Sequence, residues 1–163
     1  DPEVFNYSQN VNALYLSSNL QLINDYSLLA GFRYENTNIK GDWDNNSNEK
    51  FTNSYDNYLP NLTFSKKLST GKSLKLSYNN RIGRPSSSYI NTNTNLTNNQ
   101  NITIGNPELT PMLTKQIELG YNSFGRKYQG SYYIYLKDSE DMFESVIEIS
   151  NDTSITTYQK GLV

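Results

Sequence analysis

The clearest periodic pattern in this chain is Tyr26-Ser27-Leu28-Leu29-Ala30-Gly31-Phe32-Arg33-Tyr34-Glu35. Apolar or aromatic residues occupy every second position, and Arg33 and Glu35 belong to the intervening set. A period of two places alternate side chains on opposite faces of an extended strand. The stretch is therefore predicted to be a β-strand with one apolar face and one face turned toward water.

The same alternation returns at residues 58–64, 74–78 and 117–121. Pro60 lies in the first of these segments and is expected near a strand start or a bulge, because proline cannot donate to a ladder. Residues 11–16 and 128–137 are also strand-like. Their apolar residues occupy both odd and even positions, so neither face is assigned as apolar. The residues predicted to share one apolar face are Tyr26, Leu28, Ala30, Phe32, Leu74, Leu76, Tyr78, Ile117, Leu119 and Tyr121.

Short and long connections alternate between these strands. Asn24-Asp25 and the segments 69–72 and 124–127 have the composition of tight turns, whereas residues 41–57 and 85–110 are long and polar. Compact soluble domains rarely keep two such loops, but membrane barrels pair short periplasmic turns with long extracellular loops. The predicted fold is all-β, an antiparallel meander of six or seven strands from a large outer-membrane-type barrel.

Two regions near the C-terminal end complete the predicted meander. Residues 140–149 would form a short helix by composition, but their β-branched end favours a long bent strand. Residues 154–162 supply the seventh strand.

Composition and charge exclude several function classes. The hydrophobic fraction is only 35%, but 13% of residues are aromatic, which argues against a disordered chain. The net charge of -2 comes without a basic block, so nucleic acid is not an expected partner. Histidine and cysteine are absent, which removes thiolate metal sites, cysteine nucleophiles and the usual neutral general base. No catalytic residues and no cofactor are assigned, and the chain is predicted not to be an enzyme.

Four motifs in order resemble the large outer-membrane β-barrel families of Bacteroidetes, which include TonB-dependent receptors. The resemblance covers roughly residues 5–161, with one departure at Met112, where the family has glutamate. The four motifs are Ala30-Gly31-Phe32-Arg33-Tyr34-Glu35, Tyr58-Leu59-Pro60-Asn61-Leu62, Tyr78-Asn79-Asn80-Arg81-Ile82-Gly83-Arg84-Pro85-Ser86, and Gly105-Asn106-Pro107-Glu108-Leu109-Thr110-Pro111 with the following strand.

The resemblance implies a place in the bacterial outer membrane and a role in the uptake of a scarce ligand, such as a chelated metal or a glycan. Such receptors have an N-terminal plug and a barrel of about 22 strands. Residues 1–163 are therefore expected to be a fragment of a barrel domain without its plug. The implied partners are outer membrane lipid, the ligand, and a TonB-type energy-coupling protein that acts through the missing plug.

Candidate site residues fall into three sets. Side chains of the polar parity are predicted to face the lumen: Arg33, Glu35, Lys75, Arg81 and Glu118. The loops supply ligand-contact candidates: Asp42, Trp43, Asp44, Tyr89 and Asn91. The segment that leads from the second long loop into its strand is expected to set the register of that strand: Gly105, Asn106, Pro107, Leu109 and Pro111.

A calcium loop at residues 42–53 is not predicted. Asp42, Asp44 and Asn46 match the first ligand positions of an EF-hand, but Ser47 and Asn53 replace the required glycine and glutamate. No metal site is assigned.

A soluble β-sandwich for binding or adhesion remains the alternative. In a sandwich the apolar faces would pack against each other. Its short, regular turns fit the observed connections less well than a barrel does.

Overall fold

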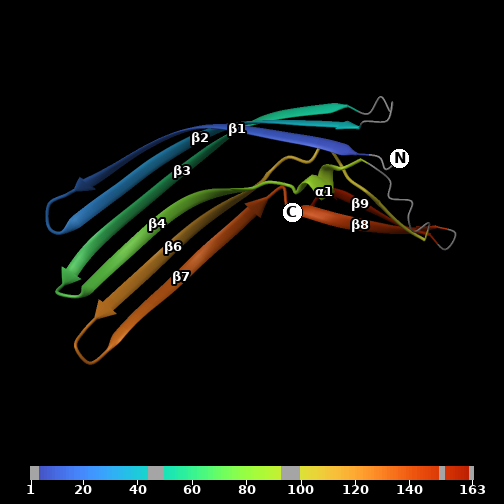
Figure 1. The fold of residues 1–163 in the computed structure, drawn as a ribbon. Coiled ribbons are helices and arrows are strands. Elements are labelled where there is room, and N and C mark those ends of the chain that lie inside the picture. Colours follow the sequence, from blue (N-terminus) through green and yellow to red (C-terminus); the bar gives the residue numbers. More distant parts are fainter. Residues whose placement is uncertain (1–3, 44–49, 93–99, 151–152, 162–163) are drawn as a thin grey trace.

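The computed structural model describes residues 4–43, 50–92, 100–150 and 153–161. These residues form nine strands and one short helix (Figure 1). In chain order the elements are β1 (Phe5–Gln21), β2 (Tyr26–Trp43), β3 (Phe51–Ser69), β4 (Lys72–Gly83), α1 (Ser87–Ile90), β5 (Asn101–Ile104), β6 (Met112–Phe124), β7 (Gln129–Glu140), β8 (Phe143–Ser150) and β9 (Thr153–Lys160).

Six strands form one antiparallel sheet in the order β1-β2-β3-β4-β6-β7. The predicted tight turns connect them. Asn24 and Asp25 have positive φ angles of 56° and 62°, as a two-residue hairpin turn requires. Gly71 has φ 76°, and a Cβ there would lie 2.1 Å from the Phe124 carbonyl oxygen, so only glycine fits.

The strand register confirms the predicted division into two faces. Leu28 pairs with Phe64, Leu76 with Leu119, and Tyr78 with Ile117, so the ten predicted residues share what we call the apolar face. Side chains of the other parity form the polar face. It includes Arg33, Glu35, Lys75, Arg81 and Glu118.

The prediction for Pro60 was wrong. Pro60 lies inside β3 opposite Phe32, away from the strand start and from the irregularity between Lys67 and Ser69. Proline has no backbone N–H to donate to a neighbouring strand. Pro60 is tolerated because the ladder between β3 and β4 stops at Asn61, the residue next to it.

The long connections are more ordered than predicted. Residues 41–57 are largely strand, because β2 continues to Trp43 and β3 starts at Phe51. Residues 85–110 contain α1 and β5. The expected bent strand at 140–149 is instead split at Asp141, which has φ 56°, into the end of β7 and the start of β8.

A second sheet was not predicted. It has the order β5-β9-β8, and β5 pairs with β9 in parallel. The fold is therefore all-β as predicted, and the six-stranded sheet is the predicted antiparallel meander. The strand expected as the seventh, β9, lies instead in the second sheet with β5 and β8.

The second sheet and its neighbours form a layer on the polar face. We call α1, β5, residues 105–111, β8 and β9 the loop layer. In Figure 1 it lies beneath the ends of β1, β2 and β3 that are remote from the turns. Ile39 of β2 packs there against Ile90 and Leu109, and the three form the buried core cluster of the described residues.

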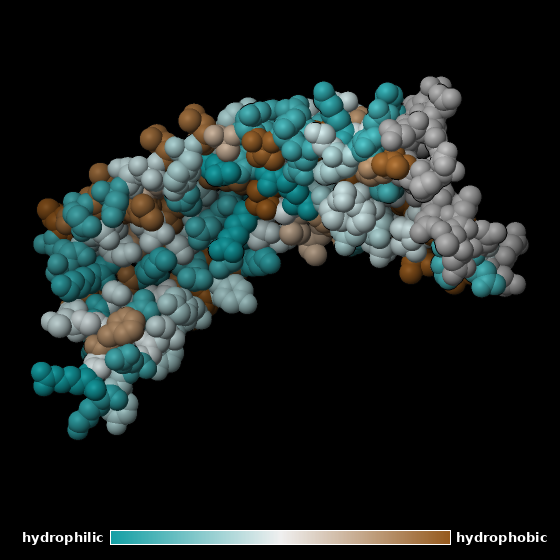
Figure 2. All heavy atoms as spheres, viewed as in Figure 1, coloured by the Kyte–Doolittle hydropathy of each residue, from teal (hydrophilic) through white to brown (hydrophobic). Residues whose placement is uncertain are grey.

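The apolar face is uncovered. Leu16 and Leu136, at opposite sides of the sheet, have 75% and 73% of their surface exposed. Figure 2 shows hydrophobic side chains protruding along the rim over the turn-side halves of β1 and β2. None of the described helices is long and apolar enough to cross a membrane.

Aromatic pairs mark the two ends of the uncovered apolar band. At the turn side Tyr26 and Phe64 stack with ring centroids 5.2 Å apart, and Lys66 Nζ lies 4.5 Å from the Tyr26 ring centroid. At the other side the Tyr34 and Tyr58 rings lie 5.5 Å apart. From Tyr26 to Tyr34 the strand rises about 26 Å, or about 20 Å after the tilt of a barrel strand. We call this region the apolar band.

Candidate ligand site on the polar face

Aromatic side chains attach the loop layer to the wall of the sheet. Tyr89 of α1 stacks on Tyr158 of β9 with ring centroids 4.5 Å apart. Phe143 of β8 packs edge-to-face against the Tyr89 ring, with ring centroids 6.1 Å apart. These three rings pack with Tyr55 and Phe51 of β3 around the buried cluster. Two loops far apart in sequence are thereby joined to the same part of the wall.

The segment 105–111 connects the parts of this layer through its backbone. Gly105 N donates to Asn91 O at 2.8 Å and Asn106 N donates to Tyr89 O at 2.7 Å. The Asn106 side chain donates to Tyr158 O at 3.1 Å and accepts from Glu108 N at 2.9 Å. The segment 105–111 therefore links α1 to β9 and also leads into β6.

Two further contacts fix this segment against the wall. Asn53 Nδ2 of β3 donates to Pro107 O at 3.3 Å. Leu109 is 1% exposed, and Pro111 is buried immediately before β6 begins. These contacts give the segment a tertiary role, while its role in setting the register of β6 stays a prediction.

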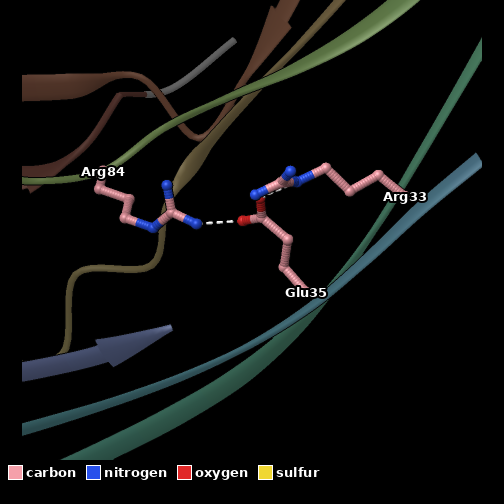
Figure 3. A network of polar contacts seen from close by, with 3 residues as sticks. All are labelled: Arg33, Glu35 and Arg84. Atoms are coloured by element: carbon pink, nitrogen blue, oxygen red, sulfur yellow. Dashed lines mark hydrogen bonds and ion pairs between the residues drawn. The ribbon is translucent and has the colours of Figure 1, made fainter. Parts of the chain in front are cut away.

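Glu35 lies beside the loop layer on the polar face and is 3% exposed (Figure 3). Arg33 Nε donates to its Oε1, and an Arg84 Nη atom donates to its Oε2. A buried carboxylate is stable only when it is paired and hydrogen-bonded, which the two guanidinium groups accomplish. Arg84 follows β4 directly, so this contact reaches across from β4 to β2 where the ladder between β3 and β4 has ended.

Polar side chains surround this carboxylate on the loop side of the apolar band. Thr37 and Asn57 are buried next to it on β2 and β3. Burial is the main reason that the pKa values of the Tyr7 and Tyr55 phenols are raised, although the positive charge of Arg84 opposes the shift at both. Both phenols are therefore neutral hydrogen-bonding groups at physiological pH.

The loop candidates occupy different environments. Tyr89 and Asn91 make packing and backbone contacts inside the loop layer. Asp42 pairs with Lys50 at 3.1 Å, and Trp43 is the last residue of β2. Asp44 and Asn46 lie outside the described residues. The structure therefore places Tyr89 and Asn91 in contact with the loop layer and Asp42 at the end of β2, in an ion pair with Lys50.

The five residues predicted to face the lumen share the polar face, but they do not form one cluster. Arg33 and Glu35 contact each other, whereas Lys75 and Arg81 lie on β4 and Glu118 lies opposite Ser77 on β6. Gln116 Nε2 donates to Glu118 Oε2 at 3.3 Å.

Sequence reasoning missed Arg84 and the loop layer. Arg84 was visible only as part of a strand-end motif, because nothing local links it to Glu35, 49 positions away. A signal for the loop layer was present in the apolar residues Ile90, Ile102, Ile104 and Leu109, which interrupt an otherwise polar stretch. In the described part of the chain no three His, Cys, Asp or Glu residues converge in a way that could hold a metal ion.

Comparison with known families decides the relationship of the chain. Residues 2–159 match the model of the "Outer membrane protein beta-barrel family". The chain belongs to this family. Its place is accordingly the bacterial outer membrane. The resemblance inferred from the four motifs is confirmed, while an origin in Bacteroidetes stays a prediction.

Solved structures of larger proteins contain the same fold. The chain is similar to the hemophore receptor HasR of Serratia marcescens, solved as a double mutant with its hemophore HasA and heme. That match has a TM-score of 0.77, 11% identity, and covers 95% of this chain and 30% of the receptor.

Two further structures agree. The copper transporter OprC matches with a TM-score of 0.63 and 14% identity over 97% of this chain and 24% of its own. The siderophore receptor PirA from Pseudomonas aeruginosa matches with a TM-score of 0.60 and 12% identity over 95% of this chain and 37% of its own. The chain thus spans about a quarter to just over a third of these proteins. No match was found among the curated proteins.

Proposed function

We propose that this chain forms part of the wall and part of the outer mouth of a larger outer-membrane receptor, which takes up a scarce ligand such as a chelated metal or a glycan. One observation carries the proposal: the sheet is apolar over a membrane-sized band on one face, and the loop layer packs only on the other. In a barrel the uncovered face meets lipid, and the loop layer narrows the mouth from within.

The larger protein is inferred from the geometry of six strands. Barrel diameter grows with strand number, and six strands cannot enclose a folded domain. Both faces of β1 and β7 are mostly exposed, as expected for strands that lack a neighbour on one side. We propose that residues 1–163 are one part of a barrel domain, and that a plug domain lies in another part of the protein and contacts a TonB-type energy-coupling protein.

Ligand recognition is assigned to the mouth. The proposed contacts are Asp42, Trp43, Asp44, Tyr89 and Asn91, presented by a rigid wall on which loop variation is tolerated. Below them Arg33, Glu35, Lys75, Arg81 and Glu118 face the lumen. The 105–111 segment positions the loop layer without touching the ligand itself. We propose no catalytic chemistry for any of these residues.

The sandwich alternative fits the packing poorly. A sandwich buries the apolar faces of its two sheets against each other. Here the second sheet lies on the polar side, and the large apolar side chains of β1 and β7 remain exposed. In water such a face would be an aggregation hazard, whereas in lipid it is the expected surface.

Uptake by the full-length protein in its own bacterium tests the proposal. A deletion strain and its complemented parent are grown with limiting amounts of ferric chelates, copper, heme or single glycans. We expect the deletion strain to stop growing on one supply and the complemented strain to grow on it. A protonophore should abolish the uptake of that supply by the complemented strain. Growth that is equal on every supply, with the protein shown to be in the outer membrane, would refute energised uptake of these ligands.

A further inference from the structure

The charged residues of the six-stranded sheet are divided unequally between its faces. The apolar face carries charges only outside or at the ends of its band, four basic and four acidic, which cancel. These are Lys40, Lys66, Lys72, Lys115, Asp42, Asp56, Asp138 and Glu140. The polar face carries five basic and two acidic residues, a net of three positive charges. These are Arg33, Lys67, Lys75, Arg81, Lys137, Glu35 and Glu118.

This excess opposes the composition of the chain, whose net charge is -2. It is also incompletely neutralised. Both oxygens of Glu35 are occupied by Arg33 and by Arg84, which adds a further positive charge from the segment after β4. Across the described part of the chain, no carboxylate lies within ion-pair distance of Lys75, Arg81 or Lys137.

The unpaired cations extend along the wall from the loop layer toward the turns. Arg81 lies near the end of β4 that adjoins the loop layer, and Lys75 lies six residues closer to the turn, a distance of about 20 Å along the strand. Lys137 lies opposite Gln116 on the neighbouring pair of strands. A concave wall of one charge sign concentrates ions of the opposite sign, and guanidinium groups bind carboxylates and phosphates by paired hydrogen bonds.

We propose that the polar face is a binding track for an anionic ligand, one that carries several carboxylate, phosphate or similar oxyanion groups. This inference rests on the proposed uptake function and narrows its ligand class. Arg81, Lys75 and Lys137 supply the attraction, because Arg33 and Arg84 are committed to Glu35. A neutral glycan or a cationic chelate would gain nothing from this arrangement.

Binding of charged dyes to the purified full-length protein in detergent tests the proposal. The probes are pyrenetetrasulfonate, a fluorescent tetra-anion, and a pyrene that carries a trimethylammonium group. The variant combines K75Q, R81Q and K137Q, and the control combines K40Q, K72Q and K115Q, which removes the same number of charges from the other face. We expect the wild type and the control to bind the anion alike, with an affinity that falls as salt rises, and the variant to bind about tenfold more weakly.

Two results would overturn the inference: equal affinity of the wild type for both probes, or an unchanged affinity for the anion in the K75Q/R81Q/K137Q variant. Where this variant fails to assemble, R81Q and K137Q are tested singly, because both side chains are exposed and leave the core untouched. Failure of the uptake proposal is seen separately, as growth that does not depend on the protein. In that case the dye measurement still reports the charge preference of the face.

Discussion

The turn-side half of the six-stranded sheet and its loop-side half are built from the same strands but are stabilised differently. In the turn-side half, side chains alternate between two faces, and each hairpin pairs with its next neighbour. In the loop-side half, β1, β2 and β3 continue beyond the apolar band, and their polar face is covered by residues from two distant loops. The first half relies on local pairing and on lipid, and the second on tertiary packing.

The two halves are therefore expected to respond differently to substitution. A charge on the apolar face of the turn-side half has no partner and no water, so it acts on membrane insertion. A change in the loop layer is expected to alter that layer while the wall persists. Three of the following predictions pair a substitution with a matched control, and the first compares strands of the two halves within one variant.

The largest local effect is expected from Leu109→Ala. Leu109 is almost fully buried against Ile39 and Ile90, and truncating such a side chain costs about 2–5 kcal/mol through lost contacts and a cavity. Hydrogen exchange of the full-length protein should rise in α1, β5 and β9 but stay low in β4 and β6. Exchange that rises equally in both groups of strands would show that the two halves unfold together.

Leu119→Arg is expected to act on the wall. Leu119 lies on the apolar face between Leu76 and Ile134, and an arginine near the bilayer midplane costs roughly 2–4 kcal/mol. The fraction of protein that reaches the folded, heat-modifiable form in the outer membrane should fall. Glu118→Arg is the control, because the adjacent residue is on the polar face and should assemble normally. Equal assembly of both variants would contradict the assignment of the two faces.

Glu35→Gln is expected to loosen the junction between the halves. The substitution leaves the Arg33 and Arg84 guanidinium groups without a carboxylate, at a cost of about 1–3 kcal/mol after allowance for the partial exposure of Arg33. Backbone hydrogen exchange of residues 84–90 in the folded protein should become faster. Lys115→Gln breaks an exposed ion pair with Glu140 and should leave that rate unchanged. Equally slow hydrogen exchange in both variants would mean that the ion pair does not hold this segment.

Asn106→Ala should have the smallest effect. It removes two hydrogen bonds of the Asn106 side chain, one to Tyr158 O and one from Glu108 N, together worth about 1–2 kcal/mol. Exchange of the β9 amides should increase by about tenfold, while the same substitution at the exposed Asn12 of β1 should leave them unchanged. A global loss of stability would place Asn106 in the wall and not in the loop layer.

Much of the wall was predictable because its signals are local. The alternation around Phe32 and around Leu119 gave the correct faces, and Asn24-Asp25 and Gly71 gave the correct turns. Pro60 was placed incorrectly because a proline is tolerated wherever its strand has no partner on one side. Where the ladder between β3 and β4 stops is a property of the assembled sheet.

The candidate site was less predictable. The polar parity of Arg33 and Glu35 followed from the period of two, but the pairing of Glu35 with Arg84 spans 49 positions and follows from no pattern. Likewise, Tyr89 was chosen for its place in a long loop. The structure stacks its ring on Tyr158, which was expected only in a further strand of the meander.

The all-β class, the hairpin turns and the division of side chains between two faces follow from local sequence patterns, because strand periodicity and turn chemistry act over a few neighbouring residues. Three features emerge in the folded chain alone: two distant loops share one sheet, this sheet covers the polar face, and Glu35 is buried between two arginines. These features depend on contacts between residues tens of positions apart. These contacts stabilise the fold only after the wall has formed and has brought the loop ends together.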